Sequence, residues 1–128
     1  MNTETRKKVD LKKLEPFFVD ERGSIYDIVE APVGHVGLVT FTKGAIRANH
    51  YHLESTQYSL VLSGTIKVTT SEVDGSNKQE SILEEGMLST VAPYIVHTYE
   101  ALSEAKMLDI TTLSRAADGY EKDTVRMT

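Results

Sequence analysis

The sequence consists largely of short segments in which apolar and polar residues alternate, separated by turn residues. Successive side chains of a strand point to opposite faces, so this alternation predicts strands with one buried face. We identify about nine such segments, at the spacing of eight to twelve residues that is typical of sandwiches and barrels. DGSN at 74–77 predicts a tight hairpin turn. No helical stripe of useful length is present, so the predicted fold class is all-β, an antiparallel sandwich or barrel.

The composition excludes several classes of protein. The chain has 128 residues, enough for one domain, and a net charge of −5. An acidic body argues against nucleic acid as a partner, and no apolar run is long enough to span a membrane. There is no cysteine, hence no thiol nucleophile or thiolate ligand. Together with the absence of an apolar leader, this predicts a cytoplasmic location.

Charge also suggests how the chain is divided. Residues 1–13 carry a balance of +3, which leaves −8 for the remainder. Short basic runs at a terminus are usually solvated. We therefore expect a basic N-terminal arm over residues 1–16 and a β-barrel domain over residues 17–128, in which a C-terminal tail without alternation wraps the barrel or pairs with a partner.

Two histidines one residue apart form the main candidate site. His50 and His52 project to the same face of a predicted strand, with Cβ atoms about 7 Å apart. Two imidazoles at this spacing can converge on one metal ion. Gln57 and His97 lie on other predicted strands, and the interior of a small closed barrel can bring them to the same point.

The glycines around this pair carry a family resemblance. Intervals of five, one, four and six residues separate Gly44, His50, His52, Gln57 and Gly64. These intervals resemble the first motif of the cupin superfamily, in which a carboxylate most often stands at the position of Gln57. The resemblance implies a single-domain jelly-roll barrel, and a divalent metal ion (Zn, Ni, Fe, Mn or Co) held by His50, His52, Gln57 and His97.

The second cupin motif is matched more loosely. Gly86 and His97 keep the expected separation, but Pro93 is one place late. No glycine follows this proline, and the asparagine usual after the histidine is missing. Small cupins pair through strands, and the edge strands predicted here need cover, so we expect a homodimer.

The neutral amide of Gln57 affects the chemistry of a bound metal. Three imidazoles and an amide leave the ion its full charge, which favours Lewis-acid chemistry at a carbonyl or a water molecule. Anionic ligands favour higher oxidation states, so Gln57 argues against oxygen activation.

Two groups of cupins that act on sugars share further features with the chain. Asp109, followed six residues later by Arg115, resembles the uronate-linearising cupins, although Thr111 stands where those carry an aromatic residue. VDERGSIYDIVE at 19–30 and YEKDT at 120–124 resemble the sugar-nucleotide epimerase and ketoisomerase cupins, which often work without metal and use His and Tyr as base and acid. Both resemblances imply carbohydrate isomerisation or epimerisation.

Strand parity gives the expected contents of the pocket. If His50 and His52 face inward, Ile46 and Ala48 do as well, and Arg47 faces away. Tyr99, on the same face as His97, is either a proton donor or an aromatic filler of the barrel.

Asp109 is either a general base or a structural hydrogen-bonding residue. Arg115 would hold an anionic group of the substrate. Glu54 is expected to be a solvated charge, and His35 to be structural or exposed.

Three functions remain open at this stage. The first is a metal-dependent sugar isomerase, epimerase or ring-opening enzyme that acts on a small-molecule substrate. The second is an Fe(II)-dependent dioxygenase, against which Gln57 argues. The third is a non-catalytic cupin that binds a metal ion or a small molecule.

Overall fold

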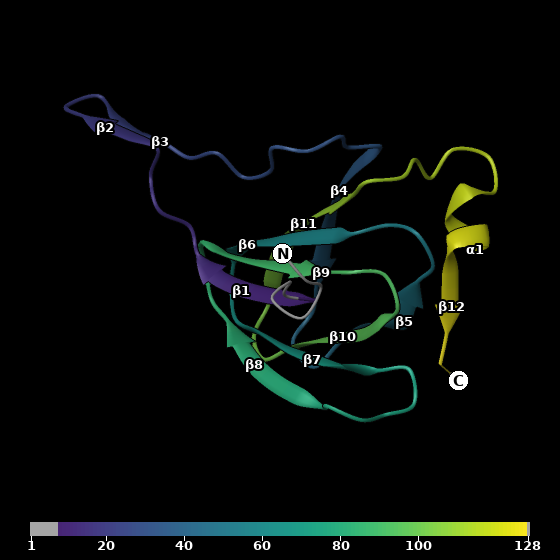
Figure 1. Ribbon diagram of the computed structural model, residues 1–128. Coiled ribbons are helices and arrows are strands. Elements are labelled where there is room, and N and C mark those ends of the chain that lie inside the picture. Colours follow the sequence, from purple (N-terminus) through teal and green to yellow (C-terminus); the bar gives the residue numbers. More distant parts are fainter. Residues whose placement is uncertain (1–7, 128) are drawn as a thin grey trace.

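In the computed structural model, which describes residues 8–127, two five-stranded antiparallel sheets face each other (Figure 1). In spatial order, the first sheet contains β1 (Val9–Lys13), β9 (Met87–Val91), β6 (Gln57–Ser63), β11 (Ala105–Thr111) and β4 (His35–Phe41). The second contains β12 (Thr124–Arg126), β5 (Ile46–His52), β10 (Ile95–Ala101), β7 (Ile66–Glu72) and β8 (Gln79–Leu83). The predicted all-β class is confirmed.

Two further elements lie outside these sheets. β2 (Phe18–Asp20) and β3 (Gly23–Ile25) form a separate hairpin that projects away from the barrel (Figure 1). In the described part of the chain the one helix is α1 (Gly119–Asp123), which is short and precedes β12 near the C-terminus. Within residues 8–127 no helix is both long and apolar enough to cross a membrane.

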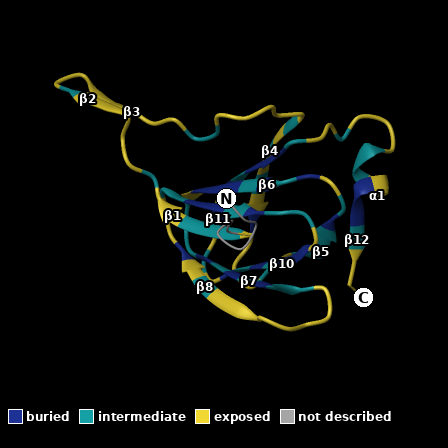
Figure 2. Cartoon of the chain, viewed as in Figure 1, coloured by how far each residue is buried: buried dark blue, intermediate teal, exposed yellow. Residues whose placement is uncertain are grey.

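The core lies between the sheets because the strands alternate as the sequence predicted. Along β7 and β10 nearly every second side chain is buried. In Figure 2 the buried residues follow the strands of the two sheets, whereas the β2–β3 hairpin is largely exposed. The largest buried apolar cluster consists of Phe41, Val61, Ile66, Val68, Leu83, Tyr99, Ala101, Ala105 and Met107.

Turn residues set the register as expected. Gly75 has a φ of 89°, and the amide of Ser76 donates to the Asp74 carboxylate, which closes the predicted β7–β8 hairpin. Gly64 has a φ of 85°, and a Cβ there would collide with the carbonyl oxygen of Glu104. The last glycine of the first motif is therefore required by backbone geometry.

Part of the expected N-terminal arm is a strand instead. Val9 and Leu11 pair with Val91 and Ser89 of β9, and Leu11 packs against the core cluster. Val9 and Leu11 share one face of β1 and are partly buried, whereas Lys12 and Lys13 at the end of the strand are exposed. The prediction of a solvated arm over 1–16 is thus wrong for residues 9–13, and residues 1–7 lie outside the described part of the chain.

The C-terminal tail pairs within its own chain. Thr124, Val125 and Arg126 in β12 lie opposite His52, Tyr51 and His50 of β5. This pairing adds a strand to the sheet that carries the histidines, and it brings the preceding helix over the same end of the barrel (Figure 1).

Candidate active site

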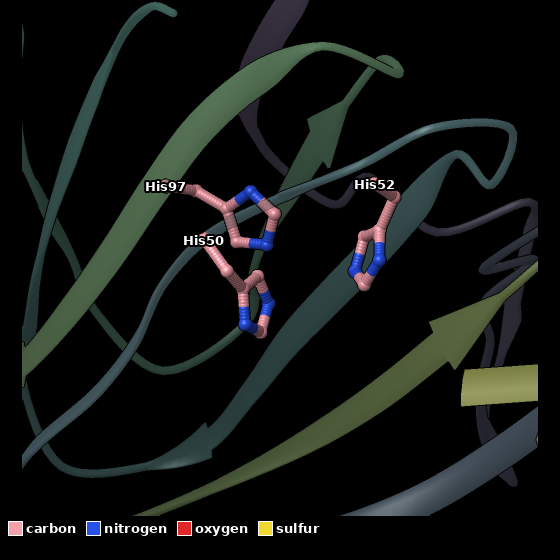
Figure 3. Close-up of side chains that lie close together, drawn as sticks. All are labelled: His50, His52 and His97. Atoms are coloured by element: carbon pink, nitrogen blue, oxygen red, sulfur yellow. The ribbon is translucent and has the colours of Figure 1, made fainter. Parts of the chain in front are cut away.

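Three buried imidazoles converge at one end of the barrel (Figure 3). His50 and His52 come from β5, and His97 comes from the neighbouring strand β10, directly opposite His50. The ring centroids lie 4.7 to 5.4 Å apart. One ring nitrogen from each lies within 4.8 Å of the other two. The strand parity of His50 and His52 is as predicted.

The opposite sheet supplies the fourth predicted ligand. Gln57 begins β6, and its Oε1 lies 2.9 Å from His52 Nε2 and 3.2 Å from His97 Nε2. Two ligands bound at about 2.1 Å lie roughly 3.0 Å apart at a right angle and roughly 3.4 Å apart at the tetrahedral angle. These donors are therefore spaced as a first-row divalent ion requires, and the residues fit such an ion.

Hydrogen bonds on the far side of two rings constrain their protons. His97 Nδ1 lies 3.0 Å from the carbonyl oxygen of Ile95, which can only accept. His52 Nδ1 lies 3.3 Å from Thr124 Oγ1 and 3.5 Å from the carboxylate of Asp123. A carboxylate behind an imidazole fixes the orientation of the ring.

The ring of His50, unlike those of His52 and His97, has no hydrogen-bond partner in the described chain, and it lines the cavity described below. Burial, and then the nearby His52, Arg126 and Arg115, lower the pKa of His50 to about 4. Burial likewise lowers the pKa of His97 to about 3. Both are therefore neutral at pH 7, and His50 has a lone pair available to a ligand.

Tyr99 lies on the same face of β10 as His97 and is fully buried. Its hydroxyl is 3.0 Å from Ser59 Oγ, to which the Gln57 amide donates at 3.3 Å. Burial raises the pKa of Tyr99 to about 12, against the opposing effect of the bond to Ser59. The phenol is therefore protonated at neutral pH and can donate. Tyr99 also belongs to the core cluster.

Asp109 and Arg115 form an ion pair, with Arg115 Nη2 donating to Asp109 Oδ2 at 2.6 Å. The guanidinium also lies 4.4 Å from the ring centroid of Tyr120. Within the described chain, Asp109 Oδ1 and Arg115 Nε are buried without a hydrogen-bond partner. Both residues thus keep one polar atom available to a ligand.

These groups surround one cavity of about 190 Å³ that opens to solvent. Its lining consists of Val39, Phe41, Arg47, Ala48, His50, Gln57, Tyr99, Met107, Asp109, Arg115 and Tyr120. The predicted Tyr99, Asp109 and Arg115 therefore share the cavity with His50 and Gln57, while His52 and His97 lie behind it.

A bulge in β5 corrects the prediction for Arg47 and Ile46. Ala48 and Asn49 have φ values of 74° and 60°, and the register with β10 shifts by one residue there. Arg47 consequently lies opposite Tyr99 and lines the cavity, whereas Ile46 is 63% exposed. The expectation that Arg47 faces away and Ile46 faces inward was wrong, because simple parity fails across a bulge.

The sequence analysis also missed three residues of the tail. Tyr120 covers the cavity, and Asp123 and Thr124 stand behind His52. The resemblance of YEKDT to epimerase cupins was the only signal for them. Of the two remaining residues, Glu54 is exposed as expected, and His35 is half-buried at the start of β4.

Comparison with family models identifies the chain. Residues 18–125 match the family described as the polysaccharide biosynthesis C-terminal domain. The chain belongs to this family. A comparison with curated proteins found no match.

Solved structures show which fold this polysaccharide biosynthesis domain adopts. The sugar 3,4-ketoisomerase QdtA from Thermoanaerobacterium thermosaccharolyticum, solved with TDP, is 20% identical, with a TM-score of 0.73 over 96% of this chain and 90% of that one. The dTDP-4-dehydrorhamnose 3,5-epimerase from Sulfolobus tokodaii is 17% identical, with a TM-score of 0.75 over 97% and 79%. The TDP-fucose-3,4-ketoisomerase WlaRA from Campylobacter jejuni is 15% identical, with a TM-score of 0.74 over 94% and 90%. The predicted cupin jelly roll is thus confirmed.

Proposed function

We propose that the chain is an isomerase or epimerase of a keto sugar carried on a nucleotide. The observation that carries this proposal is the cavity itself, where an unpartnered neutral imidazole and a protonated phenol meet. His50 provides a base, Tyr99 provides an acid, and both line the same small space. A base and an acid placed in this way can remove a proton from the carbon next to a carbonyl group and return one.

In the proposed reaction, His50 removes the proton from a carbon next to the sugar carbonyl. The electron pair of the C–H bond moves into the carbonyl, which becomes an enolate oxygen, and the Tyr99 hydroxyl donates a hydrogen bond or its proton to that oxygen. Return of a proton to the same carbon from the other face gives the epimer. Its return elsewhere on the enediol, with the carbonyl reforming one carbon along, gives the isomer.

Charge at the cavity favours an anionic substrate. Arg47 makes no ion pair with any described residue; its guanidinium donates to the carbonyl oxygen of Thr40 at 3.0 Å. Arg115 is anchored by Asp109 and keeps its Nε without a partner. Two guanidinium groups at one opening suit a diphosphate. In this proposal Asp109 orients Arg115, and a direct part for Asp109 in proton transfer stays a prediction.

The names of the structural neighbours support the same substrate class. The three proteins compared above are named as an epimerase and ketoisomerases of sugars, two of them with dTDP or TDP in the substrate name, and QdtA was solved with TDP. The choice of residues rests on the cavity of this chain.

The direct test is to incubate the chain with a panel of TDP- and UDP-linked 4-keto sugars and to follow the products by NMR. We expect an epimer or a shifted carbonyl, with no oxygen consumed. Oxygen uptake that depends on ferrous iron would favour the dioxygenase alternative instead. Tight binding of a nucleotide sugar without any conversion would favour the non-catalytic one.

We propose separately that the imidazole cluster (His50, His52 and His97) binds a divalent metal ion together with Gln57. In that state His50 is a ligand, so it acts as the base described above only in the metal-free protein. Because the Ile95 carbonyl takes the proton of His97 Nδ1, a neutral His97 has a bare Nε2. That atom faces the Gln57 oxygen at 3.2 Å, so two acceptors lie against each other. A cation bound by both removes the repulsion, and its chemistry would be polarisation of a carbonyl or hydroxyl oxygen.

The metal proposal has its own test, independent of turnover. Protein purified without added metal is exposed in turn to Zn, Ni, Mn, Co and Fe(II), desalted, and examined by elemental analysis and thermal unfolding. We expect about one ion per chain, a Tm that falls on chelation, and loss of both effects in His52→Asn but not in His35→Asn. If every metal gave close to zero ions per chain, the proposal would be contradicted. The amide of Gln57 would then be rotated by half a turn, with its nitrogen donating to the imidazoles.

A further inference from the structure

Two buried serines lie side by side on the inner face of the first sheet. Ser59 in β6 is paired with Ser89 in β9, and both residues are fully shielded from solvent. The inward neighbours of Ser89 along β9 are Met87 and Val91, which are apolar, so its hydroxyl lies in the core. Buried hydroxyl groups are usually hydrogen-bonded, because an unpaired one costs free energy. The partners of these two hydroxyls therefore indicate their roles.

The hydroxyl of Ser59 joins Gln57 to Tyr99. Its Oγ accepts from the side-chain nitrogen of Gln57 at 3.3 Å, because an amide nitrogen can only donate. The same Oγ lies 3.0 Å from the Tyr99 hydroxyl. Asp109 lies opposite Ser59 on β11, but its buried Oδ1 has no hydrogen-bond partner in the described chain. The phenol oxygen is therefore the acceptor for the proton of Ser59.

This direction leaves the proton of Tyr99 available to the cavity. A hydroxyl has one proton, and the oxygen of Tyr99 already accepts from Ser59. The proton of Tyr99 then has no acceptor among residues 8–127, and Tyr99 lines the cavity in which the sugar carbonyl is proposed to bind. Ser59 thus holds the proposed acid in the orientation in which it can donate.

The hydroxyl of Ser89 makes no hydrogen bond in the described chain, although it is fully buried. It nevertheless lies near the phenol. Burial raises the pKa of Tyr99 to about 12, and the hydroxyls of Ser59 and Ser89 both act against this rise. A hydrogen bond to a charged oxygen is about twice as strong as one to a neutral oxygen. Loss of the Tyr99 proton would therefore give Ser89 the partner that it lacks.

We propose that Ser59 and Ser89 are positioning residues that form a cradle for the hydroxyl oxygen of Tyr99. Ser59 directs the phenol proton into the cavity. When the O–H bond of Tyr99 breaks and its proton passes to the enolate oxygen, the electron pair stays on the phenolate oxygen, to which Ser89 then donates. The phenolate regains a proton when the enediol reverts to a carbonyl. This inference rests on the proposed function, in which Tyr99 is the acid.

The first test is thermal unfolding, which needs no substrate. Ser89→Ala removes a buried hydroxyl that has no partner, so Tm should rise by about 2–5 °C. Ser59→Ala leaves Gln57 and Tyr99 without their partner, so Tm should fall by about the same amount. A fall in Tm for Ser89→Ala would show that its hydroxyl is already hydrogen-bonded in the resting protein, and would overturn the proposal.

The second test is a double-mutant cycle on the turnover of a keto sugar. Ser89→Ala and Ser59→Ala should each lower kcat by about tenfold, with KM changed by less than about twofold. In a Tyr99→Phe background the same two changes should leave kcat within about twofold, because the oxygen that they support is gone. The matched control is Ser103→Ala in the turn between β10 and β11, which should leave kcat unchanged in both backgrounds.

The outcomes of the cycle separate this inference from the proposed function. Equal losses of kcat in the two backgrounds would show that the serines act on packing alone. No loss in either background would show that their hydroxyls take no part in turnover. Either result overturns the cradle and leaves the proposed function in place. A wild type that turns over no sugar would instead overturn the proposed function and the cradle together.

Discussion

Two groups of residues in and behind the cavity differ in charge. In the proposed mechanism, this difference gives one group the role of proton transfer and the other the role of substrate binding. The imidazole cluster and Gln57 are buried, and burial keeps His50 and His97 neutral by lowering their pKa values. The Asp109–Arg115 pair is ionic, short and partly open to solvent. A neutral base can take up a proton, whereas a fixed ion pair can bind an anion but gains little by exchanging protons. In the proposed mechanism, the first group therefore transfers the proton and the second binds the substrate.

The largest effect is expected from His50→Asn, which removes the free imidazole. We expect kcat for a keto-sugar substrate to fall by at least about a thousandfold, because general base catalysis contributes 10²–10⁴-fold. The matched control, His35→Asn, should retain activity. If the two variants turned over equally well, the base would lie outside the imidazole cluster.

Low pH should lower the free energy of unfolding, because His50 is buried in its neutral form. The pKa of His50 is about 4 in the folded chain and about 6.5 when unfolded. The unfolded chain therefore binds the proton first, and stability is lost as the pH falls from about 6.5 to about 4, by roughly 3 kcal/mol for His50. Urea unfolding of the wild type between pH 7.5 and pH 4 should show this loss. His50→Asn should show a shallower pH dependence, and identical curves for the two proteins would contradict the assignment.

Tyr99→Phe removes the proposed acid while it keeps the aromatic packing. We expect kcat to fall by about ten- to a hundredfold and KM to change little. The cost in stability should be about 1 kcal/mol, from the lost hydrogen bond with Ser59. Tyr58→Phe, on the outer side of β6, is the control. A Tyr99 variant with full activity would leave this tyrosine as a packing residue only.

The smallest effect on chemistry is expected from Asp109→Asn. This change removes the ion pair that orients Arg115. KM should therefore rise by about tenfold, and kcat should fall by less than tenfold. Asp118→Asn, which breaks an exposed pair with Lys122, is the control. A loss of a thousandfold in kcat, at unchanged KM, would instead make Asp109 the base and reverse the comparison between the two groups.

Periodicity was sufficient to predict most of the barrel from sequence. β4 to β11 lie where alternation placed them, and the glycine intervals around His50 and Gln57 located the cavity. The outward turn of Ile46 could not be foreseen, because Ala48 rarely adopts a left-handed backbone, and Asn49, which does so more readily, lies inside an otherwise regular strand pattern. β12 is three residues long, too short for a pattern, so its contribution behind His52 was seen only in the structure.

The central claim is that this cavity moves a proton next to a carbonyl, and solvent exchange tests it most directly. The chain is incubated in D₂O with TDP-linked 4-keto sugars, and deuterium at the carbons beside the carbonyl is followed by NMR. We predict uptake by the wild type at one of these carbons, even where no net product forms, and none above background with His50→Asn. Absence of deuterium in every sugar that the protein demonstrably binds would contradict the account.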